Sequence, residues 1–332
     1  MILAALALGA IAPADDAATA CPVELVVLGA GQDAGAPQIG NADDDGLRLL
    51  PSSLGLIDRE EGKRYLFDAT PAITEQLAML DKIEPPKEGL GVDGVFLTHA
   101  HIGHYLGLAY FGREAAGAKD VHVYATPRME AFLRENGPWS QLVDLGNITF
   151  PMAQKLSPNP LSNPTSWPVK VLGGENTGKM RLAFLSGGLG ATALPVAHRD
   201  EYSETVGWIV ADPDEFSFLY LPDIDLWDAE LSDGEESALI GLVQKVDFAF
   251  IDATFWDDNE LPGRDMSKIP HPRVTETMDL LQHLPAEQRA KVHFIHYNHT
   301  NPIRDPGSAE SREVKSRGFN IARRGDRICL GD

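Results

Sequence analysis

Short runs of apolar or alternating residues predict that much of the first half of the chain forms β-strands. Such runs occupy Val23–Ala30, Ser52–Asp58, Arg64–Phe67, Val92–Leu97 and Val121–Ala125. Helices are predicted between them at Pro71–Ile83, His104–Phe111 and Pro127–Asn136. The Gly-rich segment Gly31–Gly40, directly after the first strand, predicts a turn.

The second half of the chain repeats this theme. Strands are predicted at Leu182–Ser186, Thr192–Val196, Val206–Val210, Phe216–Leu221, Phe248–Ile251 and Val292–Ile295. Helices are predicted at about Asp228–Gln244 and Val274–His283. Proline and glycine are dense from 151 to 178, which indicates a crossover between the halves. Two strand-rich halves with helices between them predict an α/β protein of two packed sheets flanked by helices, with residues 23–332 forming a single domain.

The composition indicates a globular protein and disfavours one class of binding partner. The chain has 332 residues, of which 43% are hydrophobic and 23% charged, so it can bury a large core. Acidic residues number 49 against 28 basic ones, and the net charge is −21. Because phosphate backbones are bound by Lys- and Arg-rich surfaces, this charge disfavours nucleic acid as a partner. We expect a small-molecule substrate instead.

The N-terminal segment resembles an export signal. The apolar run Ile2–Ala12 leads into Ala12–Ala14, which has the form of a signal-peptide cleavage site, and the run is too short to span a membrane. We therefore expect residues 1–22 to be a signal peptide and short leader, and the protein to be periplasmic or secreted. A disordered apolar tail is the alternative, since no basic residue precedes the run. In an oxidising compartment Cys21 and Cys329 could pair and join the chain ends; lipidation of Cys21 is the other possibility.

The strongest chemical signal is a histidine cluster directly after the predicted strand Val92–Leu97. His99, His101 and His104 fall within six residues. Imidazoles in one tight loop can converge, and neutral imidazole is a preferred ligand of zinc and similar transition metals. The cluster therefore predicts a metal site.

Three further candidate ligands also stand where a predicted strand gives way to a loop: His198, Asp223 and His296. Each has an ordinary alternative, because a lone histidine is often a surface residue and an aspartate often caps a helix. Loops on a rigid scaffold are nevertheless where functional side chains concentrate. We expect these residues to join the cluster.

This order of residues resembles the metallo-β-lactamase superfamily: H-x-H-x-x-H after a strand, then a single His, an Asp and a strand-end His. Within it, the chain is similar to the pyrroloquinoline-quinone biosynthesis protein B branch. The matching stretches are Leu28–Gln38, Asp252–Trp256, Ile269–Pro272 and Asn298–Pro302. The similarity covers nearly the whole chain after residue 22, and it implies an αββα four-layer sandwich with the metal site at the sheet edges.

The resemblance also implies roles for the candidate ligands. It places His99, His101 and His198 around a first metal. It places His104 and His296 at a second metal, with Asp223 bridging the two. Zinc is the expected ion, as one or two ions per chain, with iron or manganese as alternatives. Metal-activated water would then attack a small ester-like, lactone, β-lactam or phosphodiester substrate, which makes the chain a metal-dependent hydrolase.

Gly103 departs from the superfamily pattern. The superfamily usually has an aspartate directly before the third histidine, as a ligand of the second metal, and glycine has no side chain to offer. His299 is a candidate replacement, unless it only hydrogen-bonds the Asn298–Pro302 turn. Further candidates, if they are not a solvated acidic loop, are Asp200, Glu201 and Glu204.

The quinone-biosynthesis branch typically lacks a full histidine cluster, so this chain departs from that branch as well. Loss of a carboxylate could leave one metal with open positions, so a mononuclear-iron oxygenase related to quinone-cofactor biosynthesis is the alternative function. A non-catalytic metal-binding protein is the other alternative.

Two other residues have candidate roles near the site. His271 is a candidate catalytic residue, as a general acid, although it could simply precede the helix Val274–His283. Asp252 ends a predicted strand and could orient a ligand histidine. His293 is excluded from the site because the period of two along its strand points it away from His296.

Overall fold

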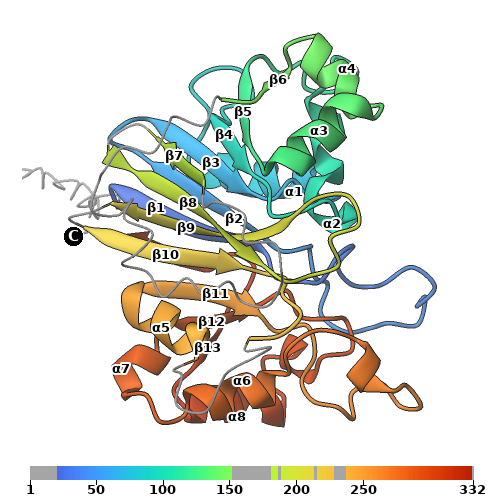
Figure 1. The fold of residues 1–332 in the computed structure, drawn as a ribbon, viewed down its shortest axis with the longest axis vertical. Helices are drawn as coiled ribbons and strands as arrows, with labels where there is room; N and C mark the ends of the chain where they lie inside the picture. The colour runs from blue at the N-terminus through green and yellow to red at the C-terminus, as the bar shows by residue number, and fades with distance from the viewer. Residues whose placement is uncertain (1–20, 152–180, 186–187, 213–214, 228–236, 331–332) are drawn as a thin grey trace, which may run out of the picture.

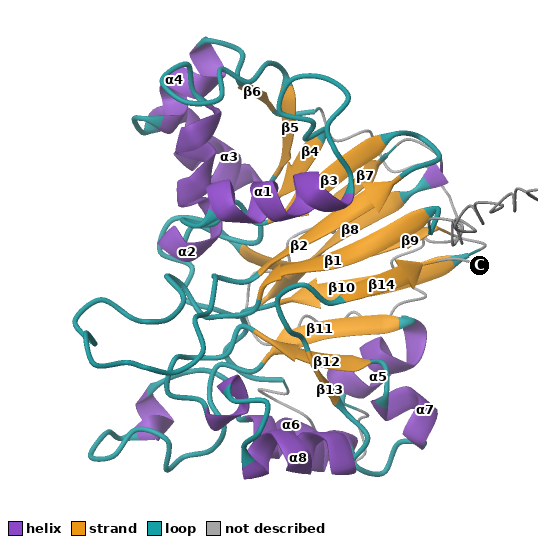
Figure 2. Ribbon diagram, turned by 180° about the vertical axis from the view of Figure 1, so that it is seen from behind, coloured by secondary structure: helices purple, strands orange, loops and turns teal. Residues whose placement is uncertain are grey.

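The computed structural model describes residues 21–151, 181–185, 188–212, 215–227 and 237–330 (Figures 1 and 2). The expected signal peptide lies outside these residues, apart from its last two positions. Almost all of the expected crossover 151–178 and the first part of the expected helix Asp228–Gln244 also lie outside them. No helix within the described ranges is long and apolar enough to cross a membrane.

Two seven-stranded sheets form the centre of the molecule. The first sheet contains, in spatial order, β14 (Arg327–Leu330), β1 (Val23–Gly29), β2 (Ser53–Asp58), β3 (Lys63–Phe67), β4 (Gly94–Phe96), β5 (Val121–Tyr124) and β6 (Ile148–Thr149). The second contains β13 (Asn320–Ile321), β12 (Val292–Ile295), β11 (Phe248–Asp252), β10 (Phe216–Leu221), β9 (Thr205–Asp212), β8 (Gly190–Val196) and β7 (Arg181–Phe184).

Helices cover the outer face of each sheet, as Figure 1 shows. Beside the first sheet lie α1 (Ile73–Ile83), α2 (Ile102–Tyr105), α3 (Pro127–Glu135) and α4 (Trp139–Asp144). Beside the second lie α5 (Ala238–Lys245), α6 (Val274–Leu281), α7 (Ala286–Arg289) and α8 (Ala309–Ser316). The predicted αββα sandwich is confirmed.

Strand β1 illustrates why a strand that is covered on both faces is largely apolar on both. Leu25 and Val27 pack into the core between the two sheets, whereas Val26 and Leu28 pack into the core beneath the helices of the first sheet. Because successive side chains of a strand point to opposite faces, a strand between two buried layers favours apolar residues at most positions. All seven residues of β1 are buried.

The two sheets are also joined by hydrogen bonds near the ends of their strands. The indole Nε1 of Trp208 donates to the carbonyl oxygen of Leu97 at 3.0 Å, and the hydroxyl of Tyr220 donates to Asp68 Oδ2 at 3.1 Å. Both bonds are buried, where a satisfied polar group specifies one arrangement and an unsatisfied one is costly. They hold the loops of the two halves in register at the end where the candidate ligands gather.

The structure differs from the predicted elements in two ways. The predicted helix His104–Phe111 is divided, with the short α2 followed by a 3-10 helix at Leu106–Phe111. Several short elements were not predicted: α4, α7, α8, β6, β13 and β14. Helix α3 ends at Glu135, before Gly137 and Pro138, and Pro138 directly precedes α4, as a proline can because the first turn needs no backbone N–H donor there.

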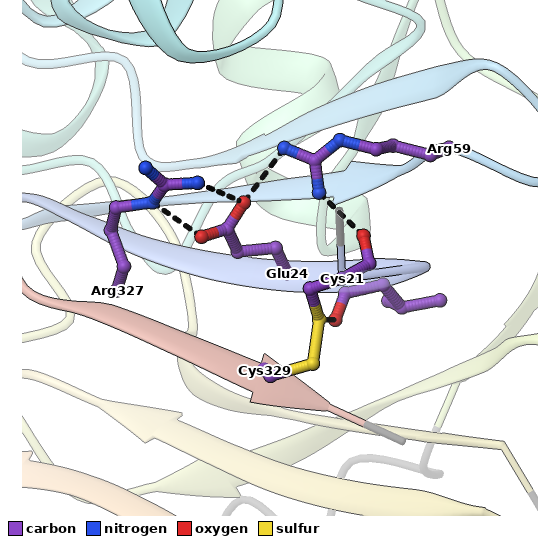
Figure 3. The surroundings of a disulfide bond; sticks show 6 residues. Cys21, Glu24, Arg59, Arg327 and Cys329 are labelled. Atoms are coloured by element: carbon purple, nitrogen blue, oxygen red, sulfur yellow. Dashed lines mark hydrogen bonds and ion pairs between the residues drawn. A yellow bond between two sulfur atoms is a disulfide. The ribbon is translucent and has the colours of Figure 1, made fainter. Parts of the chain in front are cut away.

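A disulfide bond joins Cys21 to Cys329 at the paired ends of β1 and β14 (Figure 3). Beside it, Glu24 accepts hydrogen bonds from Arg59 and Arg327. Burial raises the pKa of Glu24, but the two guanidinium groups outweigh it and the net pKa is lowered. The first and last strands of the described chain are therefore connected covalently and by an ion pair between the buried Glu24 and the half-exposed Arg327.

Candidate metal centre

The candidate ligands lie on loops that follow strands of both sheets. His99 follows β4, His198 follows β8, Asp223 follows β10 and His296 follows β12. Figures 1 and 2 show these loops gathered at the end of the sandwich opposite the C-terminus. His101 and His104 belong to the same loop as His99, at the start of α2 and within it.

The first group of donors comprises His99, His101, His198 and Asp223, whose ligand atoms all lie within 4.8 Å of one another. His101 Nδ1 lies 2.8 Å from His99 Nε2 and 3.2 Å from His198 Nε2. The Asp223 carboxylate lies close to two of these histidines. Its Oδ2 is 3.6 Å from His99 Nε2, and its Oδ1 is 3.5 Å from His198 Nε2. Three imidazoles and a carboxylate match a tetrahedral zinc donor set.

A second group comprises Asp33, His104 and His296, again within 4.8 Å. His104 Nε2 and His296 Nε2 each lie 3.3 Å from Asp223 Oδ2. Asp223 therefore lies between the two groups. The structure brings together the six ligands that the resemblance implied, and it adds Asp33, for which no role was predicted.

Three buried atoms at the centre of this cluster have no hydrogen-bond partner among the described residues: His104 Nε2, His296 Nε2 and Asp223 Oδ1. A buried polar atom without a partner costs about 1–3 kcal/mol, so such atoms need an explanation. Imidazole nitrogen and carboxylate oxygen are the donors that zinc, iron and manganese accept. The residues therefore fit a metal cofactor.

Hydrogen bonds to polar partners orient the histidine rings. His104 Nδ1 lies 2.8 Å from Asp68 Oδ2, and His198 Nδ1 lies 2.8 Å from Asp225 Oδ1. His101 instead directs Nε2 to Glu201 at 3.0 Å and keeps Nδ1 toward the centre. Such partners fix which ring nitrogen faces a metal.

Asp68 and Asp225 were missed by sequence reasoning. Asp68 directly follows β3, so the strand-end rule that singled out Asp223 also applied to it. Asp225 lies two residues beyond Asp223 in the same loop and has no strand-end signal of its own.

Without a metal, burial disfavours charge on two of the ligand histidines, whereas neighbouring carboxylates favour the protonated form of a third, His104, which would lose that proton on binding a metal. Burial lowers the pKa of His99 well below its usual value, and it also lowers the pKa of His296. Burial raises the pKa of Asp223, but His296 and His198 outweigh it and the net pKa lies well below the usual range. Burial also opposes charge on His104, yet Asp68 and Asp223 raise its pKa to about 10.

Backbone conformation is unusual at this site. Among the described non-glycine residues, four have positive φ, and three of these are Asp33 (43°), Asp68 (61°) and His296 (65°). Left-handed backbone is uncommon outside glycine, although aspartate and histidine tolerate it better than most residues. The surrounding packing holds these side chains at angles that ordinary strand ends do not provide.

His271 lies at the edge of the cluster. Its Nδ1 is 2.9 Å from Asp252 Oδ2 and 3.4 Å from Asp223 Oδ1, and these three residues form a third group of potential donors. Burial lowers the pKa of His271, but Asp252 more than offsets this and the net pKa is raised. Asp252 also accepts the backbone N–H of Ile224, so it links the β10 and β11 loops.

The other sequence candidates lie outside these three groups. His299 Nδ1 lies 2.8 Å from its neighbour Asn298 Oδ1, within the turn. Asp200 accepts the Thr205 hydroxyl, and Glu204 accepts the backbone N–H of Arg128. His293 stacks on Phe250 with ring centroids 5.0 Å apart, on the strand rather than in the site.

Glu260 joins two loops beside the site and provides a pH-dependent prediction. It accepts the backbone N–H of Trp256 and the hydroxyl of Thr300. Burial raises its pKa to about 7 from the ordinary 4.5, with Asp257 adding to the shift. Because the folded protein holds this proton more tightly than the unfolded chain, Glu260 lowers stability progressively as pH rises from about 4.5 to about 7.

Replacing Glu260 with glutamine is expected to remove that decline and to raise the free energy of unfolding at pH 8 by on the order of 2 kcal/mol. Denaturant unfolding at several pH values measures this. The exposed Glu135→Gln substitution is the matched control and should leave the pH profile as in wild type. An E260Q profile parallel to that of wild type between pH 5 and 8 would show that the Glu260 carboxyl does not titrate there.

Known proteins with a similar sequence or fold identify the family of this chain. The family described as "Beta-lactamase superfamily domain" matches residues 63–297. The chain belongs to the metallo-β-lactamase superfamily, and it is similar to coenzyme PQQ synthesis protein B. The fold is thereby established at the level of the superfamily, many of whose members are hydrolases.

Individual relatives are distant but cover most of the chain. "Coenzyme PQQ synthesis protein B" of Pseudomonas aeruginosa is 27% identical over 298 residues, which cover 84% of this chain and 87% of the relative. The crystal structure of Zn²⁺-bound PqqB from Methylobacterium extorquens superposes with a TM-score of 0.65 at 19% identity, covering 92% of this chain and 99% of that one. A diphosphatase of the PhnP family gives a TM-score of 0.58 at 20% identity, with coverage of 92% and 96%.

Proposed function

We propose that the protein is a metal-dependent hydrolase that holds two metal ions, with zinc as the first choice. The observation that carries this proposal is the pair of donor groups that share Asp223, with buried donor atoms that lack any other described partner. His99, His101 and His198 would hold one ion, His104 and His296 the other. Zinc in the similar PqqB structure supports the choice of metal.

The chemistry follows from that donor set. When bound, the ions lower the pKa of a water molecule and polarise a carbonyl or phosphoryl oxygen. Asp223 would contribute to holding both ions, while Asp68, Asp225 and Glu201 hold the imidazoles of His104, His198 and His101 in the required orientation. Small esters, lactones, β-lactams and phosphodiesters all suit such a site.

We assign His271 as the general acid of this reaction. Asp252 holds its Nδ1 at 2.9 Å, which leaves Nε2 free to give a proton to the leaving group. The ring is buried beside Asp223, so the proton is supplied where the scissile bond would lie. Asp252 fixes the ring orientation in the way that an acid partner does in other catalytic histidine pairs.

The setting is proposed to be the periplasm or the exterior of the cell. A disulfide between the chain ends persists in an oxidising compartment, which supports export. The net charge of −21 supports a small-molecule substrate over a nucleic acid.

Metal analysis and activity of three histidine variants test this function. Wild-type protein is expected to contain up to two ions and to hydrolyse at least one substrate of an ester, lactone, β-lactam and phosphodiester panel. His101→Ala should lose metal and turnover together. His271→Gln should keep its metal and lose about 10²- to 10⁴-fold in kcat, as expected for removal of a general acid. The exposed His122 on β5 provides the matched control, His122→Ala, which should change neither.

Two results would count against the proposal. Wild-type protein that takes up no metal after careful loading would reject a metal-dependent function. Oxygen uptake that depends on Fe(II), with no hydrolysis across the panel, would favour the mononuclear-iron oxygenase instead.

A further inference from the structure

Gly103 stands where the superfamily usually has an aspartate, and the structure shows what occupies that space. A Cβ atom on Gly103 would lie 2.6 Å from Asp33 Cα and 2.8 Å from the Asp33 carbonyl oxygen. These are backbone atoms, so they cannot move aside as the end of a flexible side chain can. Any side chain at 103 would therefore collide with the Asp33 backbone, and the glycine allows the Gly31–Gly40 turn to approach α2.

The same turn places the Asp33 carboxylate at the second group of donors. An Asp33 oxygen, His104 and His296 lie within 4.8 Å of one another. The Nε2 atoms of both histidines are buried and lack a hydrogen-bond partner among the described residues. Asp33 itself is only partly buried, so its carboxylate can reach the site from the rim.

The turn is tied to the strand end that carries His296. Gln32 N–H donates to the Tyr297 carbonyl at 3.1 Å, and Tyr297 N–H donates to the Ala30 carbonyl at 3.0 Å. Gln32 directly precedes Asp33 and Tyr297 directly follows His296, so these bonds hold the backbone of Asp33 close to that of His296. The left-handed backbone of Asp33, with φ of 43°, turns its side chain away from the extended path of β1.

We propose that Asp33 supplies the carboxylate ligand of the second metal, in place of the aspartate that Gly103 cannot provide. This assignment rests on the proposed two-metal function. Together with His104, His296 and the shared Asp223, it completes a set of two imidazoles and two carboxylates. The second position is thus rebuilt from a different loop rather than lost, and His299 is not needed to complete it.

Zinc titration of metal-free protein tests the assignment without any assay of activity. Calorimetry and elemental analysis after desalting should give two equivalents for wild type. Asp33→Asn should retain one tight equivalent, with the second weakened by about 100-fold or more, since even the loss of a group that only orients a ligand costs roughly 10- to 100-fold. Gly103→Ala should weaken the same equivalent, because its Cβ displaces Asp33. Visible absorption of the Co²⁺ form should report the change at the second position only.

Two variants serve as controls, and circular dichroism checks that all of them fold. Asp43→Asn, at an exposed position further along the same loop, should bind two equivalents as wild type does. His299→Ala should also keep both. An Asp33→Asn protein that binds two equally tight ions would overturn the assignment while leaving the two-metal function intact, and so would loss of the second ion in His299→Ala but not in Asp33→Asn. Wild-type protein without zinc would overturn the two-metal function and the assignment with it.

Discussion

Replacing Asp223 with asparagine is expected to empty both metal positions and to lower kcat/KM well beyond the roughly 10- to 100-fold loss that follows removal of a group hydrogen-bonded to a ligand. The reason is that the Asp223 carboxylate lies at the centre of the histidine cluster. Its two oxygens lie 3.3–3.6 Å from five histidine nitrogens, those of His99, His104, His198, His271 and His296. Asparagine has the same shape but only one acceptor oxygen and no negative charge, so it cannot bridge two cations.

Elemental analysis and turnover of Asp223→Asn measure this effect. Asp225→Asn provides a graded comparison: among the described ligand histidines, the Asp225 carboxylate hydrogen-bonds His198, so its loss should weaken the first position alone. The exposed Asp279→Asn is the neutral control. If Asp223→Asn retained two ions with wild-type affinity, the bridging role would be wrong.

Replacing Cys329 with serine is expected to lower the free energy of unfolding by about 4–6 kcal/mol, the range for a disulfide that closes a very long loop. The bond joins residues separated by 308 positions, so its removal releases nearly the whole unfolded chain from a constraint. The loss is comparable to the entire stability of many domains. The β1–β14 pairing and the Glu24 ion pairs remain, but they do not restrict the unfolded state.

Denaturant unfolding with and without reductant measures this effect. Cys21→Ser is the matched variant. The single and double variants should lose the same amount, because either substitution removes the one bond. Reductant should destabilise wild type and leave the variants unchanged. Two titratable thiols in the native oxidised protein, or a midpoint that reductant does not move, would contradict the prediction.

Much of the fold was predictable because the central strands carry their own signal. β1, β10 and β12 are largely apolar, with one polar residue each, since most of their residues are buried. The short edge strands β13 and β14 have two and four residues, and their pairing partners lie elsewhere in the chain. A local pattern cannot show such long-range pairing, so neither of these strands was predicted.

The candidate site was predictable to a similar degree and for a related reason. Asp223 and His296 stand directly beyond strands, where the sequence pattern itself marks a position at the sheet edge. Asp33 has no such mark, because it lies inside a turn whose path depends on contact with Gly103, seventy positions away along the chain. His299 is only three residues from His296 in the sequence, but this does not place it in the groups of potential ligands. Its ring instead hydrogen-bonds the side chain of Asn298.

The disulfide between Cys21 and Cys329 also changes how the molecule is connected. With that bond in place the backbone from 21 to 329 is a covalent circle, closed by sulfur at the seam. Cleavage of a single peptide bond between residues 21 and 329 would open this circle without separating the chain into two fragments. A protein nicked once by an extracellular protease would keep both sheets tethered, and it would fall into two pieces only after reduction.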